Sequence, residues 1–184
     1  DFHNLALELK DTFRVISVDQ RGRGLSDYDS DPSHYRPDVY CQDMISLLAY
    51  LKLSQIIVIG TSMGGIMAMM MAAQRPDLFR AVIMNDIGPE IDVAGLERIK
   101  GYVGGKTTFK NWSQAAEALK AQGPDIFPHY THEDWLKFAQ RTCKKQASGN
   151  IVFAYDPAIS QGMEDDEPAT VPPDLWALWD ALSD

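Results

Sequence analysis

The sequence has 184 residues, of which 45% are hydrophobic and 23% charged, and its formal net charge is −9. This length suits one domain, or one core with an insertion, and the strong negative charge argues against nucleic acid and an anionic membrane surface as partners. No apolar run is long enough to span a membrane, because Gly60–Gly65 interrupts the longest one.

The N-terminal part predicts a helix, a strand and a turn. Apolar residues at helical spacing predict a helix over residues 1–10, and Phe13–Val18 predicts a strand. The glycine-rich loop Asp19–Asp27 lacks the third glycine of a dinucleotide-binding fingerprint, and no helix starts there. We expect instead a tight turn that Asp19 and Arg21 hold through hydrogen bonds.

The centre of the sequence predicts a strand, a sharp turn and a helix. An amphipathic helix is expected from Asp38, and Ile56–Ile59 then predicts a strand buried on both faces. The turn Gly60–Gly64 follows, and the apolar run after it predicts a buried helix. We expect Gly60 and Gly64 to be required, because a side chain at either would collide where the strand and the helix cross.

Ser62 lies at the centre of this turn, in a backbone conformation that we expect most non-glycine residues to avoid. The turn lifts the Ser62 hydroxyl clear of the sheet and directs the first N–H groups of the helix at the same point. Those groups and the positive end of the helix dipole suit a developing oxyanion. The arrangement resembles the nucleophile elbow of the α/β-hydrolases.

After the turn, the sequence changes character. Ala81–Met84 predicts another short strand, so the alternating order of elements implies a parallel sheet. From Glu90 to about Pro173 there are helical patterns and many aromatic residues without a further parallel-strand signal. The elements expected there and beyond are helices over Asn111–Lys120 and Thr131–Gln146, a short extended segment over Ile151–Tyr155, and a helix from Leu175.

Three motifs together resemble the capped, bacterial-type serine hydrolases of the α/β-hydrolase fold family: Asp19–Asp27, Gly60–Gly65 and Asn85–Pro89. The later segment Tyr155–Ile159 is similar to one that such proteins carry in the cap. The resemblance implies an α/β protein in which a parallel-sheet hydrolase core, present in part, carries an inserted, mostly helical cap. We assign residues 1–89 to the core, 90–173 to the cap, and 174–184 to a helix returning to the core.

The family resemblance also implies catalytic roles. Ser62 matches the nucleophile, and the backbone N–H of Met63 matches one oxyanion donor. In the family, the second donor normally comes from a loop that would precede Asp1, and the acid and histidine would lie beyond Asp184. The chain therefore resembles the middle of such an enzyme, and we expect residues 1–184 alone to be catalytically incomplete and poorly stable.

Three residues inside the chain follow the family's order of acid and histidine. Asp86 stands at a strand end, and His129 and His132 come after it. We expect structural roles for them instead: Asp86 anchors the exit into the cap, His129 lies in a loop, and His132 lies in the first turn of a helix.

The predicted function is hydrolysis of an ester-like or other activated carbonyl substrate through an acyl-enzyme on Ser62. The substrate is expected to be a small apolar or aromatic molecule, because the cap is rich in aromatic residues: Phe109, Trp112, Phe127, Trp135 and Phe138. Two alternatives stay open, namely hydrolysis of a carbon–carbon bond next to a ketone and ligand binding without turnover. The oligomeric state is not encoded.

No metal or organic cofactor is implied. Cys41 and Cys143 are too few and too far apart for a metal site or a disulfide framework. We expect both thiols to be reduced and buried, which favours a cytoplasmic protein. The sequence opens at Asp1 without an initiator methionine, so it says nothing of a targeting segment upstream.

Overall fold

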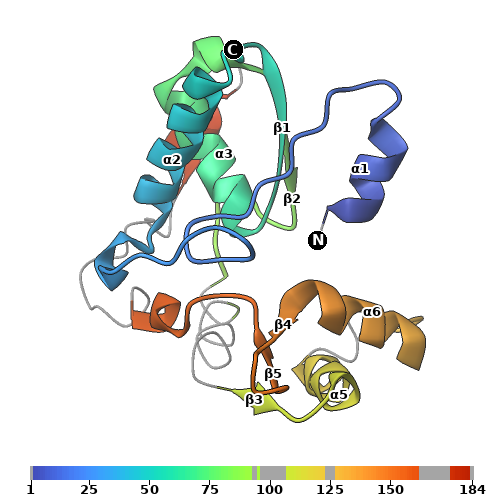
Figure 1. Cartoon of the computed structure of the whole chain (residues 1–184). Helices are drawn as coiled ribbons and strands as arrows, with labels where there is room; N and C mark the ends of the chain where they lie inside the picture. Colours follow the sequence, from blue (N-terminus) through green and yellow to red (C-terminus); the bar gives the residue numbers. More distant parts are fainter. Residues whose placement is uncertain (1, 93–94, 96–106, 123–126, 162–174, 183–184) are drawn as a thin grey trace. The chain divides into compact units, whose positions relative to one another are not determined.

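The computed structural model describes residues 2–92, 95, 107–122, 127–161 and 175–182, which belong to two compact units (Figure 1). The elbow unit comprises residues 29–103 and 158–184, and the helical unit comprises residues 1–28 and 104–157. The predicted division of the chain at residues 89/90 and 173/174 into core and cap stays a prediction.

The elbow unit is built on two parallel strands and the helix between them. Strand β1 (Ile56–Thr61) leads through Ser62 into α3 (Met63–Gln74), and β2 (Phe79–Asn85) pairs with β1 in parallel. The pairing runs to the carboxyl ends of both strands, where Thr61 lies opposite Asn85. The predicted strand, buried helix and second strand are thus confirmed, and the sheet is parallel.

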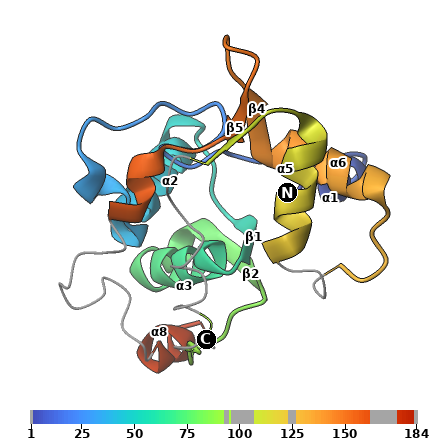
Figure 2. The same ribbon diagram turned by 90° about the horizontal axis from the view of Figure 1, so that it is seen from below.

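Helices cover one face of this sheet. Figure 2 shows α3 between α2 (Pro37–Tyr50) and α8 (Trp176–Asp180), which confirms the helices expected from Asp38 and Leu175. The middle of α3 is buried, from Gly65 to Met69, and Ile66 and Met69 form a small core with Leu175. Short 3₁₀ turns lie at Pro32–His34, Pro76–Leu78 and Pro157–Ser160.

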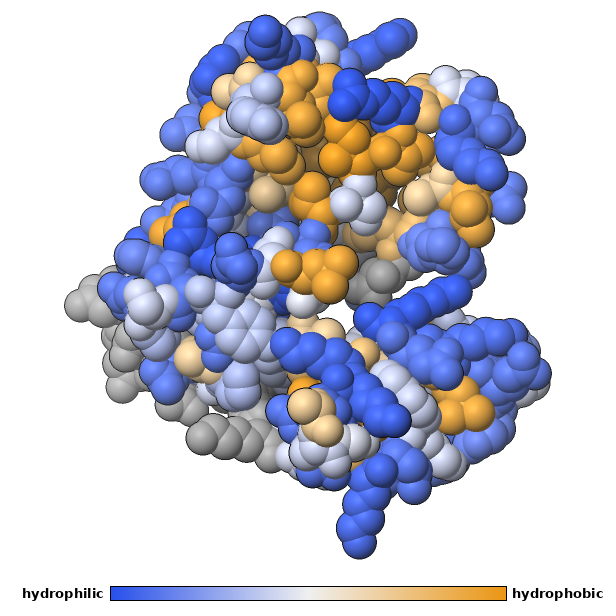
Figure 3. All heavy atoms as spheres, in the orientation of Figure 1, coloured by the Kyte–Doolittle hydropathy of each residue, from blue (hydrophilic) through white to orange (hydrophobic). Residues whose placement is uncertain are grey.

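The other face of the sheet is exposed. Ile57 of β1 and Ile83 of β2 keep 43% and 48% of their surface accessible. Figure 3 shows hydrophobic surface gathered over this part of the molecule. The expectation that β1 is buried on both faces is therefore wrong, because the described helices of this unit pack on the α3 side only.

The first element of the helical unit is α1 (His3–Leu9), which confirms the predicted N-terminal helix. The strand predicted at Phe13–Val18 is not formed, and Phe13 and Ile16 are 49% and 43% exposed. A strand exists only when a neighbour accepts its backbone hydrogen bonds. Among the residues that the structure describes, none pairs with this segment.

Two helices pack on a small sheet in the rest of the helical unit. Helix α5 (Trp112–Gln122) contacts α6 (His132–Thr142), and both contribute buried side chains to one core, including alanines from each helix and Trp135 from α6. The strands β3 (Thr108–Phe109), β5 (Ile151–Phe153) and β4 (Cys143–Lys145) form an antiparallel sheet in that order.

This small sheet corrects one prediction and confirms another. The helix predicted to continue to Gln146 ends at Thr142, because Cys143–Lys145 pairs with β5 instead. The extended segment predicted from Ile151 is β5 itself. The aromatic residues expected in the cap lie in or against the core of this unit, and the ring of Trp135 is almost wholly buried.

The loop Asp19–Asp27 forms the predicted tight turn, with the hydrogen bonds expected of Asp19, while the role expected of Arg21 stays a prediction. The Asp19 carboxylate accepts a hydrogen bond from the Leu25 N–H at 3.0 Å, and the Ser26 hydroxyl donates to the Asp19 carbonyl at 2.7 Å. The loop also binds the chain beyond β5, since the Asp156 N–H donates to the Gly22 carbonyl at 2.7 Å. Two motifs that resemble the hydrolase family, far apart in sequence, are thus hydrogen-bonded neighbours.

Candidate active site

Ser62 has the strained backbone that the sequence predicts. It lies between β1 and α3 with φ at 50° and ψ at −118°, a region that residues with a Cβ rarely occupy. Its own N–H donates to the carbonyl of Asn85 at 3.0 Å, which ties the turn to the end of β2. The position of the half-buried Ser62 side chain is therefore fixed by the ends of both β1 and β2.

The glycines around Ser62 have unequal roles. A Cβ on Gly60 would overlap the carbonyl of Gly64 and lie 2.6 Å from the Gly65 nitrogen, which confirms that Gly60 is required. A Cβ on Gly64 would meet nothing within 4 Å, so the same expectation for Gly64 is wrong. The second crowded glycine is Gly65, where a Cβ would overlap the side chain of Ile87.

The start of α3 has N–H donors without an acceptor inside the helix. The Ser62 carbonyl accepts from the N–H groups of Gly65 and Ile66 at 2.8 and 3.2 Å. The N–H of Met63, the first helical residue, has no intrahelical acceptor, and the Ser62 side chain does not cap the helix. A partial positive charge therefore remains beside the Ser62 hydroxyl, where an anionic oxygen would be stabilised.

Asp86 directly follows Asn85, whose carbonyl accepts the Ser62 N–H. It comes after Asn85 at the end of β2 and has φ at 56°, a positive value like those of Ser62, Lys52 and Gln55 in the same unit. The structural role expected of Asp86 stays a prediction. Together, Ser62, Met63 and the Asn85–Asp86 turn make up the candidate site.

The histidines considered as catalytic bases belong to the helical unit. His132 Nδ1 lies 3.4 Å from Glu117 Oε1 in an exposed pair, and His129 is exposed in a turn. In the elbow unit, Nδ1 of the exposed His34 lies 2.9 Å from Oδ2 of Asp29, whose side chain is only 12% exposed. His132 and His34 thus each pair with a carboxylate of their own unit.

Similarity to known proteins shows the family to which this chain belongs. A family model of the alpha/beta hydrolase fold matches residues 1–140. The chain belongs to this family. The strand–elbow–helix arrangement around Ser62 is thus found in an α/β-hydrolase chain, as the sequence predicted.

Several relatives resemble this α/β-hydrolase chain over much of its length. An alpha/beta hydrolase from Novosphingobium aromaticivorans is 42% identical with a TM-score of 0.91, and the match covers 98% of this chain and 64% of that one. The 3-hydroxybutyrate-oligomer hydrolase of Cupriavidus necator is 29% identical, over 97% of this chain and 62% of that protein. The 2-(acetamidomethylene)succinate hydrolase of Mesorhizobium japonicum is 32% identical, over 68% and 45%. The chain thus spans less than two thirds of the length of these relatives.

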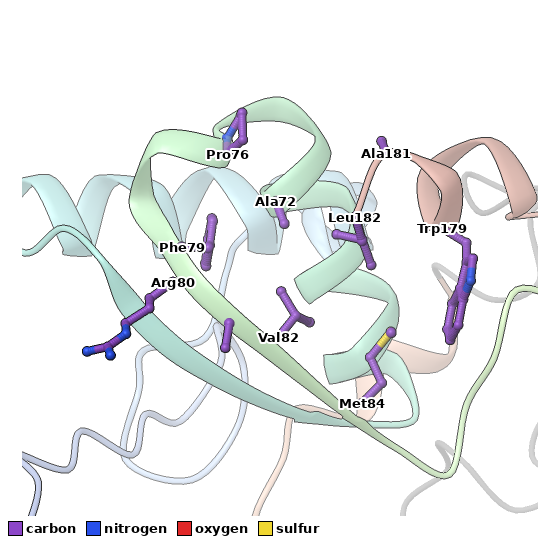
Figure 4. Close-up of a pocket in the computed structure, with 10 residues that line it drawn as sticks. Ala72, Pro76, Phe79, Arg80, Val82, Met84, Trp179, Ala181 and Leu182 are labelled. Atoms are coloured by element: carbon purple, nitrogen blue, oxygen red, sulfur yellow. The ribbon is translucent and has the colours of Figure 1, made fainter. Parts of the chain in front are cut away.

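The elbow unit of this α/β-hydrolase chain also contains an apolar pocket of about 490 Å³ (Figure 4). Residues of α3, β2 and the α8 region line it, among them Val82, Met84 and Leu182. No residue of the 60–65 turn is part of its lining. The pocket is therefore distinct from the candidate site.

The same α/β-hydrolase chain offers no metal site and no reactive thiol in its described part. Within the described ranges, no group of three metal-ligating side chains is placed to hold an ion, and no helix is long and apolar enough to cross a membrane. Cys41 and Cys143 are free and buried, as predicted. Burial raises the pKa of the Cys41 thiol to about 12 and that of Cys143 to about 11, so neither is a reactive thiolate.

Proposed function

We propose that Ser62 is the nucleophile of a serine hydrolase that cleaves ester-like or other activated carbonyl substrates. The observation that carries the proposal is the backbone of Ser62, which is strained at 50° and −118° between β1 and α3. Backbone strain of this kind is enriched at functional sites, where the surrounding structure offsets its cost. The N–H of Met63 beside it, which has no acceptor within the helix, supplies one oxyanion donor.

The proposed reaction proceeds in two stages. The Ser62 oxygen attacks the carbonyl carbon and loses its proton to a histidine base, while the carbonyl electrons move onto oxygen beside the Met63 N–H. The leaving group departs with a proton and an acyl-enzyme remains. Water then releases the acid and restores Ser62. In this proposal the base, the acid that orients it and a second oxyanion donor come from sequence outside residues 1–184.

The substrate proposal is a small molecule with an ester-like bond. One relative is named for the hydrolysis of 3-hydroxybutyrate oligomers, and oligomers of a hydroxy acid are joined by ester bonds. We assign substrate choice to the segment 90–173, acting as a cap. Within it, Trp112 is half-buried, and Tyr130 is 39% exposed and stacks on Phe127, so apolar aromatic surface is available to a ligand.

The test uses the full-length protein that contains this chain and p-nitrophenyl acetate as substrate. Ser62→Ala is expected to lower kcat by about 10³-fold or more, because only binding and the oxyanion donors remain. Ser54→Ala, at a serine just before β1, is the control and is expected to match the wild type. Equal turnover in Ser62→Ala and the wild type would contradict the proposal. Ligand binding by a wild type that turns over no ester would favour a binding protein instead.

A further inference from the structure

The end of β2 holds the start of α3 through two contacts of Asn85. Its carbonyl accepts the Ser62 N–H at 3.0 Å, and its side-chain amide donates to the Thr61 hydroxyl at 3.3 Å. Thr61 and Asn85 are also partners in the strand register. The nucleophile and the residue before it are therefore both fixed by one residue of the neighbouring strand.

The next residues bring a side chain onto the first turn of α3. Asp86, with φ at 56°, turns the chain at the end of β2, and Ile87 then lies against Gly65. A Cβ on Gly65 would overlap the Cγ2 methyl of Ile87 and lie 3.3 Å from the carbonyl oxygen of Gly60. Gly65 is thus enclosed between the backbone of β1 and the side chain of Ile87.

Ile87 has little freedom to move away. Its side chain is half-buried and packs against the small core of Ile66, Met69 and Leu175. A side chain branched at Cβ is also stiff at χ1. The methyl group that touches Gly65 therefore has a defined position relative to α3.

We propose that Ile87 is a positioning residue for the nucleophile. Its Cγ2 methyl and Gly65 together set how closely the first turn of α3 approaches β1, and hence where the Met63 N–H points relative to the Ser62 oxygen. This inference rests on the proposed function, since it takes Ser62 as the reacting group. Oxyanion donors act only within a narrow range of distances, so a small shift of this turn lowers the rate.

The test is a double-mutant cycle in the full-length protein with p-nitrophenyl acetate. Gly65→Ala is expected to lower kcat by about 10- to 100-fold with little change in KM, because the donor is displaced and the substrate pocket is not. Adding Ile87→Leu removes the branched methyl at nearly constant volume and is expected to restore kcat by about tenfold. Adding Ile87→Val instead keeps a branched methyl and is expected to restore nothing.

The results separate this inference from the proposed function. The labelling rate of Ser62 by a fluorophosphonate probe is measured for every variant that keeps the melting temperature of the wild type. A wild type labelled at Ser62, with unchanged labelling and kcat in Gly65→Ala, would overturn the role of Ile87 and leave the nucleophile in place. Equal recovery of kcat when Ile87→Leu or Ile87→Val is added to Gly65→Ala would also overturn the role of Ile87. A wild type that is not labelled at Ser62 would instead overturn the proposed function.

Discussion

The helices α3 and α6 begin in opposite ways. At α6, Thr131 and Asp134 form a capping box: the Asp134 carboxylate accepts from the Thr131 N–H at 2.9 Å, and the Asp134 N–H donates to the Thr131 hydroxyl at 3.3 Å. At α3, Ser62 makes no such cap, its backbone is strained, and the Met63 N–H has no acceptor within the helix. One start satisfies its donors, and the other leaves them available.

The two helix starts therefore differ in role: the start of α6 stabilises its helix, and the start of α3 is proposed to take part in the reaction. A capping box stabilises a helix because it satisfies donors that would otherwise lack partners. The start of α3 forgoes that stabilisation and is held by packing and by the end of β2 instead. An uncapped start with a strained backbone suits the site that we propose for an anionic oxygen.

The largest expected effect is that of Trp135→Ala in the helical unit. The Trp135 side chain is only 4% exposed, and its loss is expected to cost about 3–5 kcal/mol of stability. The buried Cys143 should then react faster with iodoacetamide, while Cys41, packed against α3, keeps its rate. The half-buried Trp112→Ala is the milder control. If Trp135→Ala raised the iodoacetamide reaction rates of Cys41 and Cys143 equally, the elbow unit and the helical unit would not respond separately.

Gly60→Ala tests the elbow unit. The new Cβ would overlap the backbone carbonyl of Gly64, and such overpacking costs about 1–3 kcal/mol or more. Cys41 should become more reactive and Cys143 should not, which is the reverse of the result for Trp135→Ala. The control is Gly64→Ala, where the Cβ has open space, and its melting temperature should equal or exceed that of the wild type.

Thr131→Ala removes the cap of α6 and should destabilise the helical unit by about 1 kcal/mol. The rate at which a fluorophosphonate labels Ser62 should not change, because the capped start serves stability alone. Thr131→Ser keeps the hydroxyl, so in a thermal or urea melt its stability should be closer to that of the wild type than to that of Thr131→Ala. A lowered Ser62 labelling rate in Thr131→Ala would contradict the division of roles.

The smallest expected effect is a pH dependence at α6. Hydrogen bonds from the Thr131 side chain and backbone lower the pKa of Asp134 below its ordinary value of 3.8. A lowered pKa in the folded state means that the contribution to stability is complete above pH 3.8 and is lost as pH falls through the folded-state value. In urea melts, the free energy of unfolding should fall less between neutral and acid pH in Thr131→Ala than in the wild type.

The sequence predicted the elbow because its signals are local. A β-branched run, the spacing of Gly60, Ser62 and Gly64, and an apolar run lie within one short stretch, and each is recognised without knowledge of distant contacts. The capping box at Thr131 was predictable for the same reason.

The errors concern contacts between distant parts of the chain. Phe13–Val18 has the composition of a strand, but pairing depends on a neighbour that composition does not reveal. The crowded glycine is Gly65 and not Gly64, because the loop after β2 places Ile87 there. Likewise, Cys143–Lys145 leaves its helical pattern because β5 offers a partner.

The most direct test of the central claim is the site of a fluorophosphonate adduct on the full-length protein, mapped by mass spectrometry. The strained, uncapped elbow is predicted to yield one adduct, on Ser62, in the folded protein and none after unfolding in urea. An adduct on another serine, or labelling of Ser62 that survives unfolding at the same rate, would contradict the claim that the fold activates this residue.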